Sequence, residues 1–279
     1  MVISGLPLTA SGERLRIEND EDVNYLSKEE IEKFYNNEFK AISLNNVSFS
    51  YLDKYGNKVD AVKDFSLTIN KNEKILIKGR SGGGKSTLFK LILSLLTPES
   101  GQINLNKEPL EQKYEKLFAY VPQDNLLMEG TIKEVVSLFD KDVDEAQFAK
   151  ALEVSESSFI NNLPLKEETF LNEKGSGLSL GEMERIAIAR AIYSDAPILL
   201  LDECSASLDA QTEEKVMSNI LSLKNKTIVL KSRLPCSNPR AQPPRIRRPQ
   251  RLLLLNQPKR RLPPRHRHRS PLQHRMKHR

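Results

Sequence analysis

The sequence predicts an α/β fold: a mainly parallel sheet carrying a phosphate-binding loop, an antiparallel β subdomain, and an α-helical subdomain. The apolar run Lys74–Lys78 leads directly into the glycine-rich segment Gly79–Thr87, and a helical pattern follows over Leu88–Leu96. A second apolar run, Pro197–Leu201, ends in two carboxylates. Apolar and polar residues alternate over Ala41–Tyr51, with one slip at Asn45 and Asn46, and again over Ala61–Ile69, which predicts the hairpin strands of the antiparallel part.

The segment Gly79–Thr87 reads GRSGGGKST and fits the phosphate-loop pattern G-x-x-x-x-G-K-[ST]. Glycines allow successive backbone N–H groups to point at phosphate oxygens, and the following helix presents its N-terminus to the same anion. The lysine would contact the phosphates, and the serine hydroxyl would ligate Mg²⁺. The predicted nucleotide-binding residues are Gly79, Arg80, Ser81, Gly82, Gly83, Gly84, Lys85, Ser86 and Thr87.

The run Pro197–Leu201 is followed by Asp202 and Glu203. A buried strand that delivers an aspartate at its carboxyl end suits a nucleotide's Mg²⁺, and the adjacent glutamate could polarise an attacking water as a general base. The alternative, a surface acidic pair, is disfavoured by the five apolar residues that precede it.

Composition favours a soluble, intracellular chain. The 279 residues are 38% hydrophobic, no apolar run approaches the roughly 18 residues needed to span a bilayer, and the start lacks a signal-peptide pattern. Two cysteines, Cys204 and Cys236, suit a reducing compartment and form no metal set.

The net charge of +6 is unevenly distributed, which predicts a boundary near residue 232. From Arg233 onward the chain carries 13 Arg and 2 Lys with no Asp or Glu, whereas the acidic remainder holds 28 basic and 37 acidic side chains. We expect a linker or connector over residues 1–40, a nucleotide domain over 41–232 and a basic Pro/Arg-rich tail over 233–279, disordered or non-native. Ser27–Asn36 is a plausible helix with a capping box, although a linker is favoured there.

Three further segments are candidates for the site. Tyr51 ends a predicted strand and is either an ordinary strand-end aromatic or a platform for adenine. Gln123 is either a turn amide or a contact to Mg²⁺ and water. Leu178–Glu182 precedes the predicted helix Met183–Ser194, so Ser179 and Gly181 form either an ordinary N-cap or a second phosphate site. Helices are also predicted over Thr131–Phe139 and Asp144–Val154.

Together these residues resemble the nucleotide-binding domain of ABC transporters, over Ile42–Lys231. Gly79–Thr87 and Leu199–Glu203 look like its Walker A and B elements, and Leu178–Glu182 looks like its signature. Gln123 matches the Q-loop, Ser207–Asp209 resembles the D-loop, and Tyr51 sits where the adenine-stacking aromatic belongs. The resemblance implies a RecA-like P-loop NTPase core and a helical subdomain over about residues 131–194.

The resemblance also implies ATP and Mg²⁺ as cofactors. Lys85, Gln123 and Glu203 would be catalytic, and Ser86, Gln123 and Asp202 would organise the metal. Two chains, identical or different, would pair head to tail, each lending Ser179 and Gly181 to the ATP held by the other.

Three stretches resemble the exporter branch of the family: residues 121–132, 172–178 and 10–14. The expected function is therefore ATP hydrolysis that powers transport through a partner transmembrane permease, at the cytoplasmic face of a membrane. Because the family's membrane helices are absent from this sequence, it is expected to be either a fragment of a longer exporter or a subunit that docks on a separate membrane protein.

Two departures from the family pattern stand out. Leu180 replaces the usual signature glycine, which is expected to weaken the second half-site. The histidine expected a few residues after Thr227–Leu230 is missing, and none occurs before His266.

The basic tail has three interpretations: a nucleic-acid or anionic-membrane arm, a disordered tail, or the product of a reading-frame slip near Lys231, which is favoured. The run 250–256 argues against a slip, because it could be a late strand of the fold. Two alternative functions stay open: a non-transport ABC ATPase acting on nucleic acid or the ribosome, although no nucleic-acid partner is expected, and a cassette that binds ATP without hydrolysing it.

Overall fold

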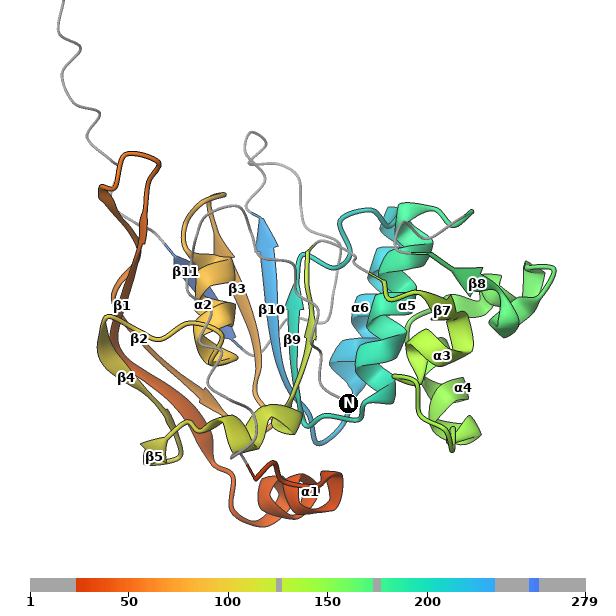
Figure 1. The fold of residues 1–279 in the computed structure, drawn as a ribbon, viewed down its shortest axis with the longest axis horizontal. Helices are drawn as coiled ribbons and strands as arrows, with labels where there is room; N and C mark the ends of the chain where they lie inside the picture. Colours follow the sequence, from red (N-terminus) through yellow and green to blue (C-terminus); the bar gives the residue numbers. More distant parts are fainter. Residues whose placement is uncertain (1–23, 124–126, 173–176, 234–250, 256–279) are drawn as a thin grey trace, which may run out of the picture.

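The computed structural model describes residues 24–123, 127–172, 177–233 and 251–255, and it contains a parallel sheet, an antiparallel sheet and a helical region (Figure 1). This arrangement confirms the predicted α/β fold. Within the described ranges no helix is both long and apolar enough to cross a membrane.

The parallel sheet has the strand order β11-β3-β10-β9-β6. Strand β10 is central, so its carboxyl end lies between those of β3 and β9: Lys231 pairs with Asp202 on one side and with Ile77 on the other. The phosphate loop and the acidic pair follow these two neighbouring strands and therefore meet at one edge of the sheet. The strands are β3 (Lys74–Gly79), β6 (Phe118–Val121), β9 (Ile198–Asp202), β10 (Thr227–Arg233) and β11 (Arg251–Leu255).

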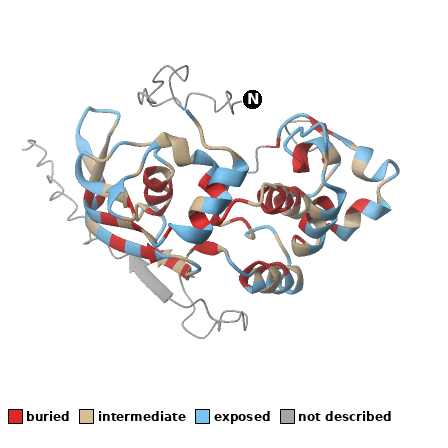
Figure 2. Ribbon diagram, turned by 90° about the horizontal axis from the view of Figure 1, so that it is seen from below, coloured by how far each residue is buried: buried red, intermediate tan, exposed pale blue. Residues whose placement is uncertain are grey.

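Both faces of the parallel sheet are covered. In β9, Ile198 and Leu200 join one buried cluster with α2 (Lys85–Ile92), whereas Leu199 and Leu201 join another with α5 (Leu180–Tyr193) and α6 (Ala210–Ser222). Figure 1 shows α2 on one side of the sheet and α5 with α6 on the other. Buried residues follow the inward sides of these elements in Figure 2. A strand buried on both faces reads as a continuous apolar run, as β9 does.

The antiparallel sheet has the order β2-β1-β4-β5 and packs against α2. Its first two strands pair as predicted, and the interruption at Asn45 and Asn46 is a register shift in which Asn46 takes a φ of 50°. Asparagine tolerates this left-handed conformation better than most residues. The strands are β1 (Ala41–Leu52), β2 (Lys58–Asn70), β4 (Ser100–Leu105) and β5 (Glu108–Pro109).

The helical region packs around α5. The predicted helix over Thr131–Phe139 is shorter than expected, because Leu138 and Phe139 both adopt positive φ and end it. Conversely, α5 begins at Leu180 rather than Met183, because Ser179 and Glu182 form a capping box. The region contains β7 (Gly130–Thr131), α3 (Ile132–Val136), α4 (Glu145–Val154), η3 (Ser157–Asn162), η4 (Lys166–Glu168) and β8 (Phe170–Leu171); η2 (Gln112–Leu117) precedes it.

The interpretation of residues 1–40 as a linker is wrong for its last part. Helix α1 (Lys28–Asn37) has the capping box of Ser27 and Glu30, and it buries Ile31 and Tyr35 in the same core cluster as the antiparallel sheet; Phe39, just after the helix, joins them. Ile31 and Tyr35 are four residues apart and share one helix face, so a polar helix still has an apolar side that packs on the core. Residues 1–23 lie outside the described ranges.

The possible late strand within 250–256 is present, because 251–255 form strand β11 alongside β3. This strand extends the parallel sheet at its edge, so the interpretation of the tail as disordered is wrong for these residues. The rest of the tail beyond residue 233 lies outside the described ranges.

Candidate nucleotide site

The phosphate loop connects β3 to α2, and its path requires glycine. Gly84 has a φ of +81°, and a Cβ there would lie 2.0 Å from the carbonyl oxygen of Ala61. Gly82 also has positive φ, at +71°. Any L-residue at position 84 would therefore be strained and would collide with backbone. The glycines bring the loop against β2 and aim the start of α2 at the space above the loop.

Lys85 supplies a buried cation at this loop. Its side chain is only 3% exposed, and its Nζ donates to the carbonyl oxygens of Gly79 at 2.8 Å and Arg80 at 2.7 Å. A bound phosphate would have to compete with these carbonyls for the ammonium. The anion's full charge makes it the stronger acceptor.

Tyr51 reaches the same loop from the antiparallel sheet. Its hydroxyl lies 3.2 Å from Thr87 Oγ1, and its ring packs edge-on to Phe49 with centroids 5.0 Å apart. This places an oriented aromatic ring beside the start of α2. Stacking of adenine on that ring stays a prediction.

The acidic pair follows β9. Asp202 is 1% exposed, and the hydroxyl of Tyr120 donates to its Oδ2 at 3.4 Å. Glu203 comes next with a φ of 52°, in the left-handed region, while its backbone N–H donates to the Lys231 carbonyl at 3.3 Å. Its carboxylate is almost fully buried. The left-handed turn carries the chain away from the sheet directly after the strand.

Lys231, at the carboxyl end of β10, places its ammonium between these groups. Nζ donates to Ser86 Oγ at 2.7 Å, forms an ion pair with Asp202 Oδ1, and lies 3.4 Å from Glu203 Oε1. The lysine side chain is only 4% exposed. One buried positive charge therefore joins the phosphate loop to both carboxylates.

The same geometry tests whether Mg²⁺ fits. The ammonium acts as a stand-in cation, and it shows that a hydroxyl of α2 and a carboxylate of β9 converge on one point. Hydroxyl and carboxylate oxygens are ligands that Mg²⁺ prefers. Ser86 and Asp202 therefore fit Mg²⁺, because their oxygens are suitable ligands and contact the same cation. Gln123 is exposed just past β6, and its part in the site remains a prediction.

The signature segment lies at the start of α5, on the exposed surface. The Ser179 hydroxyl accepts from the N–H of Glu182 at 3.3 Å and lies 2.8 Å from its Oε2, whereas Leu180 is 62% exposed. Gly181 packs against the segment Ser207–Asp209, where an added Cβ would lie 3.0 Å from Ser207 O. An open groove of about 420 Å³ runs between the two segments. It is lined by Ser179, Leu180, Gly181, Arg185, Ser207, Leu208, Asp209 and Thr212.

Beneath this groove, Glu184 fixes the Ser207–Asp209 segment to α5. It is 2% exposed, and both of its carboxylate oxygens accept from the Ser207 N–H, at 3.0 and 3.2 Å. Burial, reinforced by the negative charge of Glu184, raises the pKa of the nearby Cys204 thiol to about 12. Cys204 is therefore a neutral, packed side chain.

Sequence reasoning missed Lys231 and Glu184. Lys231 follows the apolar run of β10. A charged residue at the end of a buried strand needs a partner of opposite charge, and the two acids that follow β9 could have been recognised as that partner. Glu184 gave none, because its partner is a backbone group that only the fold brings near.

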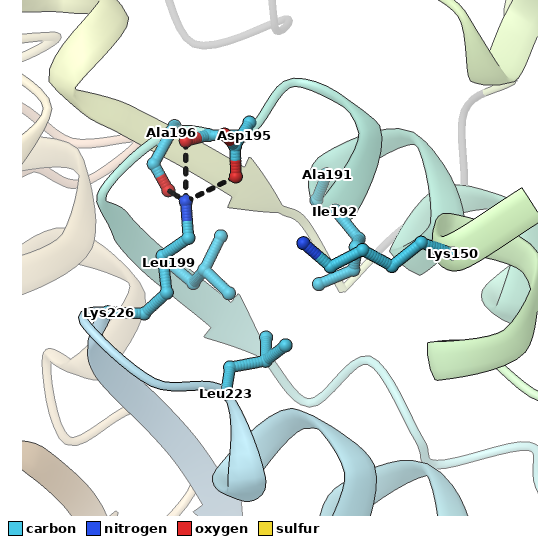
Figure 3. Close-up of a pocket in the computed structure, with 8 residues that line it drawn as sticks. All are labelled: Lys150, Ala191, Ile192, Asp195, Ala196, Leu199, Leu223 and Lys226. Atoms are coloured by element: carbon cyan, nitrogen blue, oxygen red, sulfur yellow. Dashed lines mark hydrogen bonds and ion pairs between the residues drawn. The ribbon is translucent and has the colours of Figure 1, made fainter. Parts of the chain in front are cut away.

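A second cavity, shown in Figure 3, is not a ligand site. It has a volume of about 10 Å³, room for roughly one water molecule. On its edge, Lys226 Nζ donates to Asp195 Oδ1 at 2.7 Å. Neither residue contacts the phosphate loop or the acidic pair through these bonds, and both are distant from the loop in sequence.

Comparisons with known proteins agree with this geometry. The sequence model of the family described as "ABC transporter" matches residues 62–206. The transport/processing ATP-binding protein MesD for mesentericin Y105, from Leuconostoc mesenteroides, is 40% identical over 63% of this chain and 25% of its own length. ComA of Streptococcus pneumoniae strain R6, also a transport/processing ATP-binding protein, is 33% identical over 65% of this chain and 26% of its own.

A solved structure, that of a bacterial Atm1-family ABC exporter with ATP bound, has a TM-score of 0.64 and 28% identity over 70% of this chain and 35% of the other. The chain spans about a quarter of the curated relatives and a third of that structure. The family match covers half of the chain and includes the phosphate loop and the acidic strand. The resemblance seen in the motifs is confirmed: this chain belongs to the ABC transporter family.

Proposed function

We propose that this chain binds ATP with Mg²⁺ and hydrolyses it as the ATP-binding part of an exporter-type ABC transporter. The observation that carries the proposal is the convergence of Ser86, Asp202 and Glu203 on one buried cation beside the phosphate loop. Two segments far apart in sequence, the start of α2 and the end of β9, supply the oxygen ligands and the general base that phosphoryl transfer to water needs.

Each side chain has a distinct role in this proposal. Lys85 and the loop amides hold the phosphates and stabilise charge that develops on them. Bound Mg²⁺ would supply further charge neutralisation between the phosphates, and Ser86, Asp202 and Gln123 would hold it. Glu203 orients a water and accepts its proton for in-line attack on the γ-phosphate. Its burial keeps the carboxylate close to the reacting atoms.

The proposed partners are a transmembrane permease and a second cassette, the same chain or a different one. The names of the similar proteins include transport, and the chain matches only about a quarter of the length of MesD and ComA. The exposed segment Ser179–Gly181 would face the ATP of the second cassette. The chain would then sit peripherally at the cytoplasmic face of a membrane.

The test is Mg-ATP turnover by the purified chain, compared with Lys85→Ala and Glu203→Gln. We expect both variants to lose about a hundredfold or more, because one removes a phosphate cation and the other the base. Lys90→Ala is the matched control, since Lys90 lies on the same helix but outside the loop.

Turnover that survives in both variants would overturn the proposal. ATP bound by the wild type and lost in Lys85→Ala, without any turnover, would instead assign a cassette that binds but does not hydrolyse. The position of Lys231 among the metal-binding oxygens is the observation that favours this second candidate.

A further inference from the structure

Lys231 is a buried charged residue of the described nucleotide site, and the proposed reaction does not use it. Its ammonium contacts Ser86, Asp202 and Glu203 and is almost entirely shielded from water. These are two of the groups proposed to hold Mg²⁺ and the group proposed as the base. The lysine is thus placed at the centre of the chemistry.

We propose that the Lys231 ammonium is a built-in cation that occupies the Mg²⁺ position and competes with the metal. This inference builds on the proposed function, because it concerns the same ATP site. A magnesium ion would be held by the Ser86 hydroxyl and the Asp202 carboxylate, oxygen ligands of the kind that it prefers. The ammonium already contacts both, so the two cations exclude one another.

Burial makes this competition strong. Two carboxylates that are nearly inaccessible to water require a positive partner, and Lys231 is that partner in the described structure. A metal ion that enters must displace the ammonium, because both cations would use the same oxygens of Ser86 and Asp202. The ammonium is also a compact point charge on a flexible stem, so it reaches the oxygens without distorting the strand.

The same charge changes what the metal contributes to nucleotide binding. Without a cation here, Asp202 and Glu203 would repel the phosphates of ATP, and Mg²⁺ would relieve the repulsion. With Lys231 in place, one of these two negative charges is balanced, so less of the repulsion is left for Mg²⁺ to relieve. ATP should therefore bind this chain almost as well without Mg²⁺ as with it.

The experiment measures the affinity of a fluorescent ATP analogue, trinitrophenyl-ATP, in EDTA and in saturating Mg²⁺. For the wild type we expect the two dissociation constants to agree within about threefold, and for Lys231→Met we expect Mg²⁺ to tighten binding about tenfold more, which corresponds to about 1.4 kcal/mol. Lys226→Met is the matched control, since it removes a lysine paired with Asp195 next to the start of the same strand, away from the site. It should behave as the wild type.

The variants are checked for folding by circular dichroism before titration. If Lys231→Met does not fold, Lys231→Gln replaces it, because its amide still donates to a carboxylate but carries no charge. The wild type alone also tests the idea, since a Mg²⁺ dependence of about tenfold or more in the wild type would contradict a resident cation.

The outcomes separate this inference from the proposed function. Equal Mg²⁺ dependence in the wild type and Lys231→Met, with tight binding in both, overturns the role of Lys231 and leaves the ATP site intact. Binding that is unchanged in Lys85→Ala removes the nucleotide from the phosphate loop and overturns the proposed function itself.

Discussion

The two regions that the family resemblance assigns to ATP differ sharply in how far their polar groups are already satisfied. Around the phosphate loop, Lys85 and Lys231 are buried and bound to carbonyls, a hydroxyl and carboxylates of the same chain. At the start of α5, Ser179 and Leu180 are exposed beside an open groove. The buried charges of the first region thus have partners within the chain, whereas the second region is an exposed surface that we propose faces a second cassette.

Gly84→Ala should have the largest effect of the substitutions considered, and it tests the phosphate-loop region. The added Cβ would meet the Ala61 carbonyl, so we expect the loop to be displaced and affinity for the ATP analogue to fall about a hundredfold or more. Thermal unfolding and nucleotide titration measure the two effects. Gly56→Ala is the control: it has a similar φ of +79° with open space around it, so it should cost only about 1–2 kcal/mol of stability and leave binding unchanged.

Glu184→Ala tests the support beneath the second region. It leaves the buried N–H of Ser207 without its acceptor, so we expect a loss of about 2 kcal/mol in unfolding free energy by urea denaturation. Glu184→Gln keeps an acceptor oxygen and should recover most of that loss. If alanine and glutamine destabilise equally, the carboxylate's charge rather than the hydrogen bond holds the segment.

Cys204 gives a pH-dependent test of the same support. Because burial raises its folded-state pKa to about 12 from an ordinary 9.0, its stabilising contribution is complete below pH 9 and declines as the pH rises toward 12. Relative to Cys204→Ala, the wild type should lose about 1 kcal/mol of stability between pH 9 and pH 10. A constant difference between the two proteins over that range would show that the thiol is not buried.

Leu180→Gly should have the smallest effect on the isolated chain. Leu180 is the first residue of α5 and exposed, so we expect stability to change by less than about 1 kcal/mol. Its influence should appear only between chains: ATP-dependent dimerisation, followed by size-exclusion chromatography of Glu203→Gln, should strengthen a few-fold when the bulk of the leucine is removed. Leu165→Gly, at a similarly exposed site outside the groove, serves as the control.

The local parts of this structure were predictable from the sequence. The phosphate loop, the apolar strand β9 and the capping box of Ser27 each depend on residues within a few positions of one another. The capping box of Ser179 is equally local, but the helix was predicted to begin three residues later. The bulge at Asn45 and Asn46 was visible as a break in alternation.

The rest depended on long-range pairing. The position of Lys231 opposite Asp202 follows from the register of β10 between β3 and β9, which no short window of sequence contains. Likewise, α1 was interpreted as a linker because its composition is mainly polar, and the partners of its buried residues Ile31 and Tyr35 lie in distant strands. For the same reason, the sequence did not show that β11 would pair with β3.

The left-handed backbone of Glu203 has a consequence for engineering. A residue with a side chain at φ 52° costs about 1 kcal/mol relative to glycine, so a search for thermostable variants would favour glycine at this position. That same exchange would delete the carboxylate proposed as the base. Selection for a more heat-resistant chain and selection for turnover would therefore pull residue 203 in opposite directions, and libraries screened on melting temperature alone should drift toward inactive proteins.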